Sequence, residues 1–199
     1  MRSVIGCAAA IALVFVAGCS EKKSAAPPPP VAVKGDMEEL VEKGRGDLKD
    51  YETWYHISER YEHAQQYPLE LDALQKVIAA KPDMGYAYVK MGNTYNRLGK
   101  REEAVKAFLE AQKLLPNLAV LHNNLGWTYG QLGKTKEQVA ALRQAVKLSP
   151  NYATARLSLG IVLLKQGDRK GAQEQYTALL AFDEGAAADL KKVLDGKRS

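Results

Sequence analysis

A step of 34 residues recurs along most of this chain and limits what the chain can fold into. Pro82, Pro116 and Pro150 stand one step apart, and Glu184 takes the next position. Other columns with this spacing are Ile57, Met91, Leu125 and Leu159; Ser58, Gly92, Gly126 and Gly160; and Tyr61, Tyr95, Tyr129 and Leu163. A unit this short cannot bury an apolar face by itself, so we expect the units to stack side by side.

Each unit has the pattern of two amphipathic helices joined by a tight turn. In residues 85–118 the i, i+3, i+4, i+7 spacing of one helical face is occupied by Tyr88, Met91, Gly92 and Tyr95. A second apolar face follows with Ala104, Phe108 and Ala111. Gly99 suits the C-terminal cap of the first helix, and Pro116 ends the second. The sequence therefore predicts an all-α fold of helix pairs.

These columns resemble the tetratricopeptide repeat (TPR) family, whose unit carries a large residue, Leu-Gly, Tyr, a small residue, an aromatic, an alanine and a proline. The resemblance implies a right-handed superhelix of antiparallel helix pairs, an α-solenoid, with a concave groove. It divides the chain into a degenerate repeat at 51–84 and further repeats at 85–118, 119–152 and 153–186.

Several positions depart from the family pattern. The first repeat has Gln65 in place of the turn glycine and Glu70 in the small position, and Gln138 takes that small position in the third. Residues 36–50 are expected to form an N-terminal cap, with a helix over 37–43 ended by the glycines at 44–46. Residues 187–199 are expected to form a C-terminal capping helix and tail.

The apolar run within the first 18 residues is shorter than the roughly 20 residues that span a bilayer as a helix. We therefore expect residues 1–18 to be an export signal and not a transmembrane helix. The run ends in Val16-Ala17-Gly18-Cys19, which resembles the lipobox of bacterial lipoproteins. The resemblance implies cleavage before Cys19, a diacylglycerol on its thiol and an acylated amine. With Ser20 next, it also implies the periplasmic face of the outer membrane. Residues 19–35 are proline-rich and are expected to act as a semi-rigid tether.

In the TPR family, the first helix of each pair lines the concave groove. Carried over by frame, the predicted partner-binding residues are Tyr55, Glu59, Tyr86, Val89, Asn93, Asn96, Asn123 and Trp127. Asparagine amides both donate and accept, which suits the backbone of an extended peptide. Trp127 is either an anchor for the partner or a packing residue between repeats. Likewise, Leu157, Ile161 and Leu164 are either covered by the final helix or form an exposed patch.

No catalytic, metal-binding or cofactor-binding pattern occurs in the sequence. His56 and His63 are too far apart for a helical metal pair, and phosphate-cradling glycine loops are absent. We therefore expect a protein or peptide partner and no nucleic acid, since no basic stripe alternates with stacking aromatics. Residues 35–84 carry 12 acidic and 6 basic side chains, against 10 acidic and 18 basic in residues 85–199. This polarity leaves head-to-tail self-association as an alternative.

Overall fold

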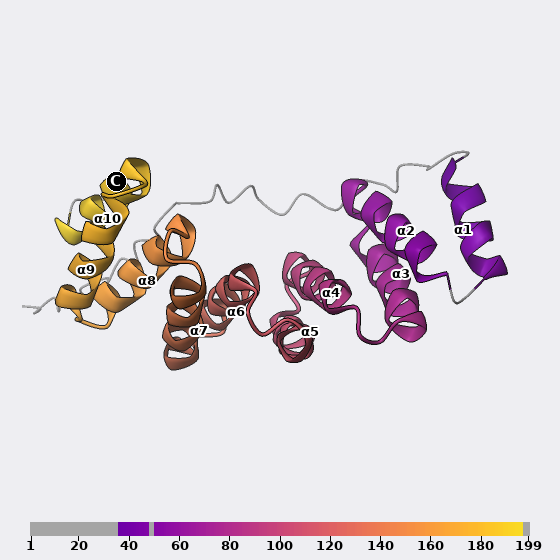
Figure 1. Cartoon of the computed structure of the whole chain (residues 1–199), viewed down its shortest axis with the longest axis horizontal. Coiled ribbons are helices and arrows are strands. Elements are labelled where there is room, and N and C mark those ends of the chain that lie inside the picture. Colours follow the sequence, from indigo (N-terminus) through magenta and orange to yellow (C-terminus); the bar gives the residue numbers. More distant parts are fainter. Residues whose placement is uncertain (1–35, 48–49, 197–199) are drawn as a thin grey trace, which may run out of the picture. The chain divides into compact units, whose positions relative to one another are not determined.

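The computed structural model describes residues 36–47 and 50–196. Within these residues there are ten α-helices and no strands, so the predicted all-α class is confirmed. Figure 1 shows the helices. Their bounds are α1 Asp36–Gly46, α2 Tyr51–His63, α3 Tyr67–Ala80, α4 Gly85–Arg97, α5 Arg101–Leu114, α6 Ala119–Gln131, α7 Thr135–Leu148, α8 Ala153–Lys165, α9 Arg169–Leu179 and α10 Glu184–Leu194.

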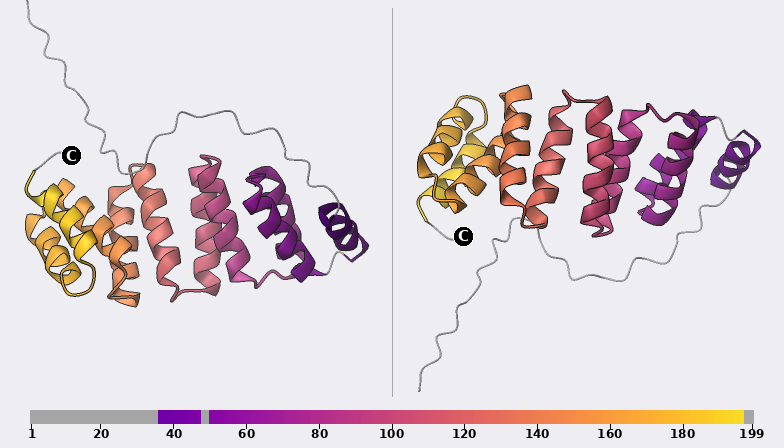
Figure 2. Two further views of the ribbon diagram at one scale, coloured as in Figure 1. Left: turned by 90° about the horizontal axis from the view of Figure 1, so that it is seen from above. Right: turned by 90° about the horizontal axis from the view of Figure 1, so that it is seen from below.

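The helices form pairs that follow one another in chain order. The most extensive packing joins α2 to α3, α4 to α5, α6 to α7 and α8 to α9, and the second helix of each of the first three pairs also packs on the first helix of the next (Figure 2). Cys19 and the rest of residues 1–35, including the expected signal and tether, lie outside the described residues. No described helix combines the length and apolarity that a membrane crossing would need.

The turn inside each pair depends on one residue with left-handed backbone geometry. Gly99, Gly133 and Gly167 have φ values of 75°, 70° and 85° at this position. Gln65 adopts the same geometry in the first pair, with φ of 56°, and is the one non-glycine residue with positive φ among the described residues. A side chain in this region clashes with its own backbone at a cost of about 1–2 kcal/mol. The first repeat therefore keeps the same turn as the other repeats, but at an energetic disadvantage.

Close helix crossing depends on a second column of glycines. A Cβ atom added to Gly92 would lie 2.5 Å from the ring of Phe108, and one added to Gly126 would lie 2.7 Å from Leu142. Both contacts are far inside van der Waals distance, so the two helices can approach this closely only where the first lacks a side chain. Phe108 and Leu142 are accordingly almost completely buried and form the centre of their repeats.

The last repeat departs from this pattern. A Cβ atom on Gly160 would meet Leu190 of α10 at 2.6 Å, where the 34-residue frame places Tyr176 of α9. Helix α9 has 11 residues whereas α3, α5 and α7 have 14, and α10 packs on both α8 and α9. Leu157, Ile161 and Leu164 are half-buried against the cluster that includes Leu190, so they form no large exposed patch.

At the N-terminal end, α1 does not stop at the glycines as expected but continues through Gly44 to Gly46. A Cβ atom on Gly44 would lie 2.9 Å from the indole of Trp54, so this part of the helix can approach Trp54 only because residue 44 lacks a side chain. Trp54 is 1% exposed, with the Lys76 ammonium 4.0 Å above its ring centroid. Gly44 thus allows α1 to cover the first apolar face of the array.

Gln65→Gly is expected to raise the free energy of unfolding by about 1 kcal/mol, because glycine adopts the left-handed turn without a steric penalty. Urea unfolding of the full-length chain followed by far-ultraviolet circular dichroism measures this change. The matched control is Gly133→Gln, where a Cβ atom would meet nothing within 4 Å, so that only the backbone penalty acts. Gly133→Gln should lower the free energy of unfolding by a similar amount. An unchanged or lower urea midpoint for Gln65→Gly would show that the left-handed geometry of Gln65 does not cost stability.

Candidate functional site

A hollow of about 330 Å³ lies between the first helices of three successive pairs, α4, α6 and α8. Its lining consists of asparagines, two hydroxyl residues, one arginine and one tryptophan, namely Asn93, Asn96, Asn123, Asn124, Thr154, Ser158, Arg97 and Trp127. We call it the amide hollow. Four of the eight predicted groove residues therefore come together here, because the frame places equivalent faces of neighbouring repeats next to one another.

The asparagines of the amide hollow are held by hydrogen bonds between repeats. The side-chain amide of Asn96 donates to the hydroxyl of Thr128 at 2.8 Å, and that of Asn124 donates to Asn93 Oδ1 at 2.9 Å. Thr128 is fully buried and donates its own hydroxyl proton to the backbone oxygen of Asn124 at 2.7 Å. Among the described residues, Asn123 has no side-chain hydrogen bond, which leaves its amide available to a partner.

Trp127 stands at the edge of the amide hollow and is 48% exposed. A second hollow of about 240 Å³ also has Trp127 and Ser158 in its lining, together with Gly130, Gln131, Gln138, Ile161, Val162 and Lys165. We call it the glycine hollow. Trp127 is thus exposed, and of its two predicted alternatives an anchoring role agrees better with this placement.

The other four predicted groove residues lie elsewhere. Val89 is 7% exposed and belongs to the core cluster with Phe108, so the prediction that it lines the groove was wrong. Tyr86 is 54% exposed, but it lines neither hollow. Tyr55 and Glu59 are half-buried on α2, where Glu59 contacts the ring nitrogen of His56 at 3.2 Å.

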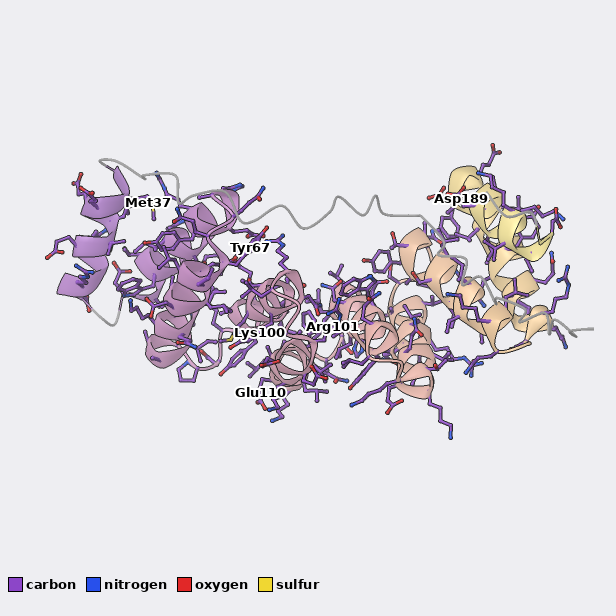
Figure 3. The ribbon with its side chains drawn as sticks, turned by 180° about the vertical axis from the view of Figure 1, so that it is seen from behind. Met37, Tyr67, Lys100, Arg101, Glu110 and Asp189 are labelled. Carbon is purple, nitrogen blue, oxygen red and sulfur yellow. The ribbon has the colours of Figure 1, made fainter. Side chains whose placement is uncertain are left out.

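A group of charged side chains adjoins the amide hollow. Glu62 on α2 forms ion pairs with Lys90 and Arg97 of α4, and its distance to Arg97 Nη1 is 2.7 Å. Burial raises the pKa of Glu62, but the hydrogen bonds from Lys90 and Arg97 outweigh it and bring that pKa below its usual value. The Arg97 guanidinium also lies 5.6 Å from the ring centroid of Tyr67, which is labelled in Figure 3. The groove prediction omitted Arg97, because its repeat position is not one of those that the family points into the groove.

Glu70, at the small position of the first repeat, is 1% exposed. Its Oε2 atom has no hydrogen-bond partner among the described residues. Burial raises the pKa of this carboxyl above its usual value. The Thr94 hydroxyl lowers that pKa, but by less, and the nearby charge of Glu62 adds to the increase. The helix pair accommodates a large residue at the small position, but at the cost of an incompletely satisfied buried group.

The described residues contain no cluster of three or more His, Cys, Asp or Glu side chains with the geometry of a metal site. His122 is buried, and its Nε2 lies 2.8 Å from the backbone oxygen of Pro116. The two hollows are lined by amide, hydroxyl, indole and aliphatic groups with one cationic side chain each, and such groups bind by hydrogen bonding, packing and ion pairing.

Comparison with known proteins agrees with this architecture. Residues 92–133 and 128–167 match the family model described as a TPR repeat. The crystal structure of MamA superposes with a TM-score of 0.71 at 19% identity, covering 76% of this chain and 89% of that one. MamA 41-end from Desulfovibrio magneticus RS-1 gives 0.68 at 20% identity, with 74% and 84% covered.

The crystal structure of YrrB, described as a TPR protein with an unusual peptide-binding site, gives a TM-score of 0.66 at 20% identity, with 81% of this chain and 86% of that one covered. No curated protein matches the chain. At these identities the structural likenesses concern the fold, which is a TPR-type solenoid.

Glu70→Gln is expected to change how stability depends on pH. The folded-state pKa of Glu70 lies above its unfolded-state value. The stability that protonated Glu70 contributes is therefore complete below the unfolded-state pKa and is lost as the pH rises through the folded-state pKa. Glutamine cannot ionise. The free energy of unfolding of Glu70→Gln should therefore exceed that of the parent by a margin that grows as the pH rises above the unfolded-state pKa of glutamate, about 4.3, and reaches roughly 1 kcal/mol once Glu70 is ionised in the folded state.

Urea unfolding at a series of pH values measures this margin. Glu62→Gln is the control with the opposite sign, because the folded-state pKa of Glu62 is lowered. The stability that ionised Glu62 contributes is present above its unfolded-state pKa and is lost as the pH falls through the folded-state pKa. If the difference in free energy of unfolding between Glu70→Gln and the parent does not vary with pH, ionisation of Glu70 does not destabilise the folded state.

Proposed function

We propose that this chain is a binding scaffold that holds a protein or an extended peptide against the amide hollow. The observation that carries this proposal is the exposure of Trp127 beside four asparagines from two neighbouring repeats. A half-exposed indole is costly to leave in water and is a frequent anchor in interfaces. The TPR-type fold supports the proposal, since such solenoids present extended concave surfaces for binding.

The chemistry of the amide hollow favours an extended segment over a folded apolar surface. An extended chain presents unpaired backbone N–H and C=O groups, and asparagine side chains both donate to and accept from them. The peptide-binding site named for YrrB, which has the same fold, adds support. A partner held through its backbone needs a further contact for specificity, and Trp127 is placed to supply it.

We further propose that the scaffold is tethered to an envelope membrane through lipid on Cys19, and that it serves in envelope, pilus or secretion assembly. The support is the sequence Val16-Ala17-Gly18-Cys19 after an apolar run, followed by a proline-rich segment before α1. Two acyl chains hold a protein to a membrane far more firmly than one. A tether of 16 residues (20–35) in polyproline II geometry would reach up to about 50 Å, so the groove would be accessible to partners near the membrane.

Trp127→Ala is expected to weaken capture of the partner by roughly 30-fold, because truncating a central aromatic anchor costs about 2 kcal/mol. The measurement is quantitative crosslinking of the full-length chain in intact cells, followed by identification of the crosslinked protein. Leu109→Ala is the control, since Leu109 is 40% exposed on α5 and lines neither hollow. Equal crosslinking by parent, Trp127→Ala and control would remove the amide hollow as the binding surface.

Cys19→Ser is expected to move the full-length chain from the detergent phase to the aqueous phase when cells of a Gram-negative host are partitioned, because the acyl chains are then absent. Immunoblotting of the two phases measures the distribution. Cys7→Ser provides a matched control within the apolar run and should remain in the detergent phase. Retention of Cys19→Ser in the detergent phase would argue against lipidation at this cysteine.

A further inference from the structure

The glycine hollow has a specific structural origin. At the repeat position of Gly130, the other repeats carry Glu62, Asn96 and Leu164. A Cβ atom on Gly130 would lie 2.5 Å from Nε2 of Gln138, so the Gln138 side chain covers the glycine. In the third repeat, Gln138 is the large residue at the small position, and Gly130, which it faces, has no side chain. This exchange leaves a space beside Trp127 with Ile161 and Lys165 in its lining.

The asparagines of the amide hollow differ in whether a bound chain can reach their side-chain oxygen. Asn96 Oδ1 is buried and has no hydrogen-bond partner among the described residues. Its orientation is set by Thr128, whose hydroxyl proton goes to the Asn124 backbone, so that the hydroxyl oxygen can only accept from the Asn96 amide nitrogen. Because the Asn96 oxygen is buried, a bound chain cannot reach it. Asn123 lines the same hollow and has no side-chain hydrogen bond among the described residues, so its oxygen can accept from a backbone N–H of a bound chain.

The charged side chains that line the two hollows have one sign. No aspartate or glutamate is among the described residues that line either of them. Arg97 is already paired with Glu62, whereas Lys165 is exposed and has no carboxylate partner in the described part of the chain. An occupant that brings a negative charge to Lys165 is therefore favoured over one that brings a positive charge.

We propose that the two hollows together bind an extended acidic segment of a partner protein. One backbone N–H of the segment donates to Asn123 Oδ1, an apolar side chain packs against Trp127 and Ile161 above Gly130, and a neighbouring carboxylate pairs with Lys165. This inference rests on the proposed scaffold function and adds the chemical class of the partner. The apolar residue supplies most of the contact area, and the carboxylate supplies the preference among partners.

Isothermal titration calorimetry on the full-length chain in mild detergent tests the charge preference. The probes are two capped peptides of sequence Ser-Ala-Leu-Asp-Asp-Ala-Ser and Ser-Ala-Leu-Lys-Lys-Ala-Ser. The acidic peptide is expected to bind roughly tenfold more tightly, and Lys165→Glu should abolish or reverse this preference. Lys147→Glu makes the same charge change on α7, where Lys147 is exposed and lines neither hollow, and it should leave the preference intact.

A second measurement tests the acceptor atom. Replacing single backbone amides of the acidic peptide by esters removes one N–H at a time, and one ester position is expected to weaken binding roughly tenfold. That loss should disappear in Asn123→Ala, which has no acceptor to leave unpaired. Equal loss in the parent and in Asn123→Ala would exclude this hydrogen bond.

The inference is overturned if neither peptide binds, if both bind equally, or if Lys165→Glu leaves the preference unchanged. None of these results bears on capture in cells. The scaffold function itself fails only if Trp127→Ala leaves that capture unaltered, so the two failures can be told apart.

Discussion

A helix pair of this length cannot bury its own apolar face, and every other feature of the structure follows from the stacking that this requires. Stacking works here because a glycine at one position of the first helix lets the second helix approach, as Gly92 does for Phe108 and Gly126 for Leu142. The ends of the array meet the same constraint by other means. Gly44 of α1 accommodates Trp54 at one end, and Leu190 of α10 fills the space opposite Gly160 at the other.

Stacking fixes where the groove lies, but one pair of positions within each repeat decides its chemistry. The small position of the second helix faces the C-terminal part of the first, as the contact of Gln138 with Gly130 and the effect of Glu62 on Glu70 indicate. In the first repeat this pair brings two carboxylates together, and Lys90 and Arg97 of the next repeat compensate one of them. In the third repeat it opens the glycine hollow. The same scaffold thus presents acidic, amide and glycine-lined sections in succession.

Much of this could be predicted from sequence, because a constant step places equivalent residues on equivalent faces. The all-α class follows from the repeat frame. The meeting of Asn93, Asn96, Asn123 and Trp127 was predicted from that frame together with the resemblance to the TPR family, in which the first helix of each pair lines the groove. The burial of a side chain cannot be predicted from the repeat frame, because it depends on neighbours in other repeats. For that reason Val89 was predicted to line the groove, although it packs in the core. The contributions of Arg97 and Lys165 were also missed, since their side chains reach the hollows from positions outside the family pattern.

The chain has two tryptophans, and the structure places them in opposite surroundings. Trp54 is enclosed between α1 and its own repeat at 1% exposure, whereas Trp127 meets solvent at 48%. Indole emission moves to shorter wavelength in apolar surroundings and is quenched by solutes only where they can reach the ring. The two indoles should therefore have separable optical signals, Trp54 reporting whether the first cap is seated and Trp127 whether the hollows are occupied. The protein in this way carries its own intrinsic probes at both places, without any added label.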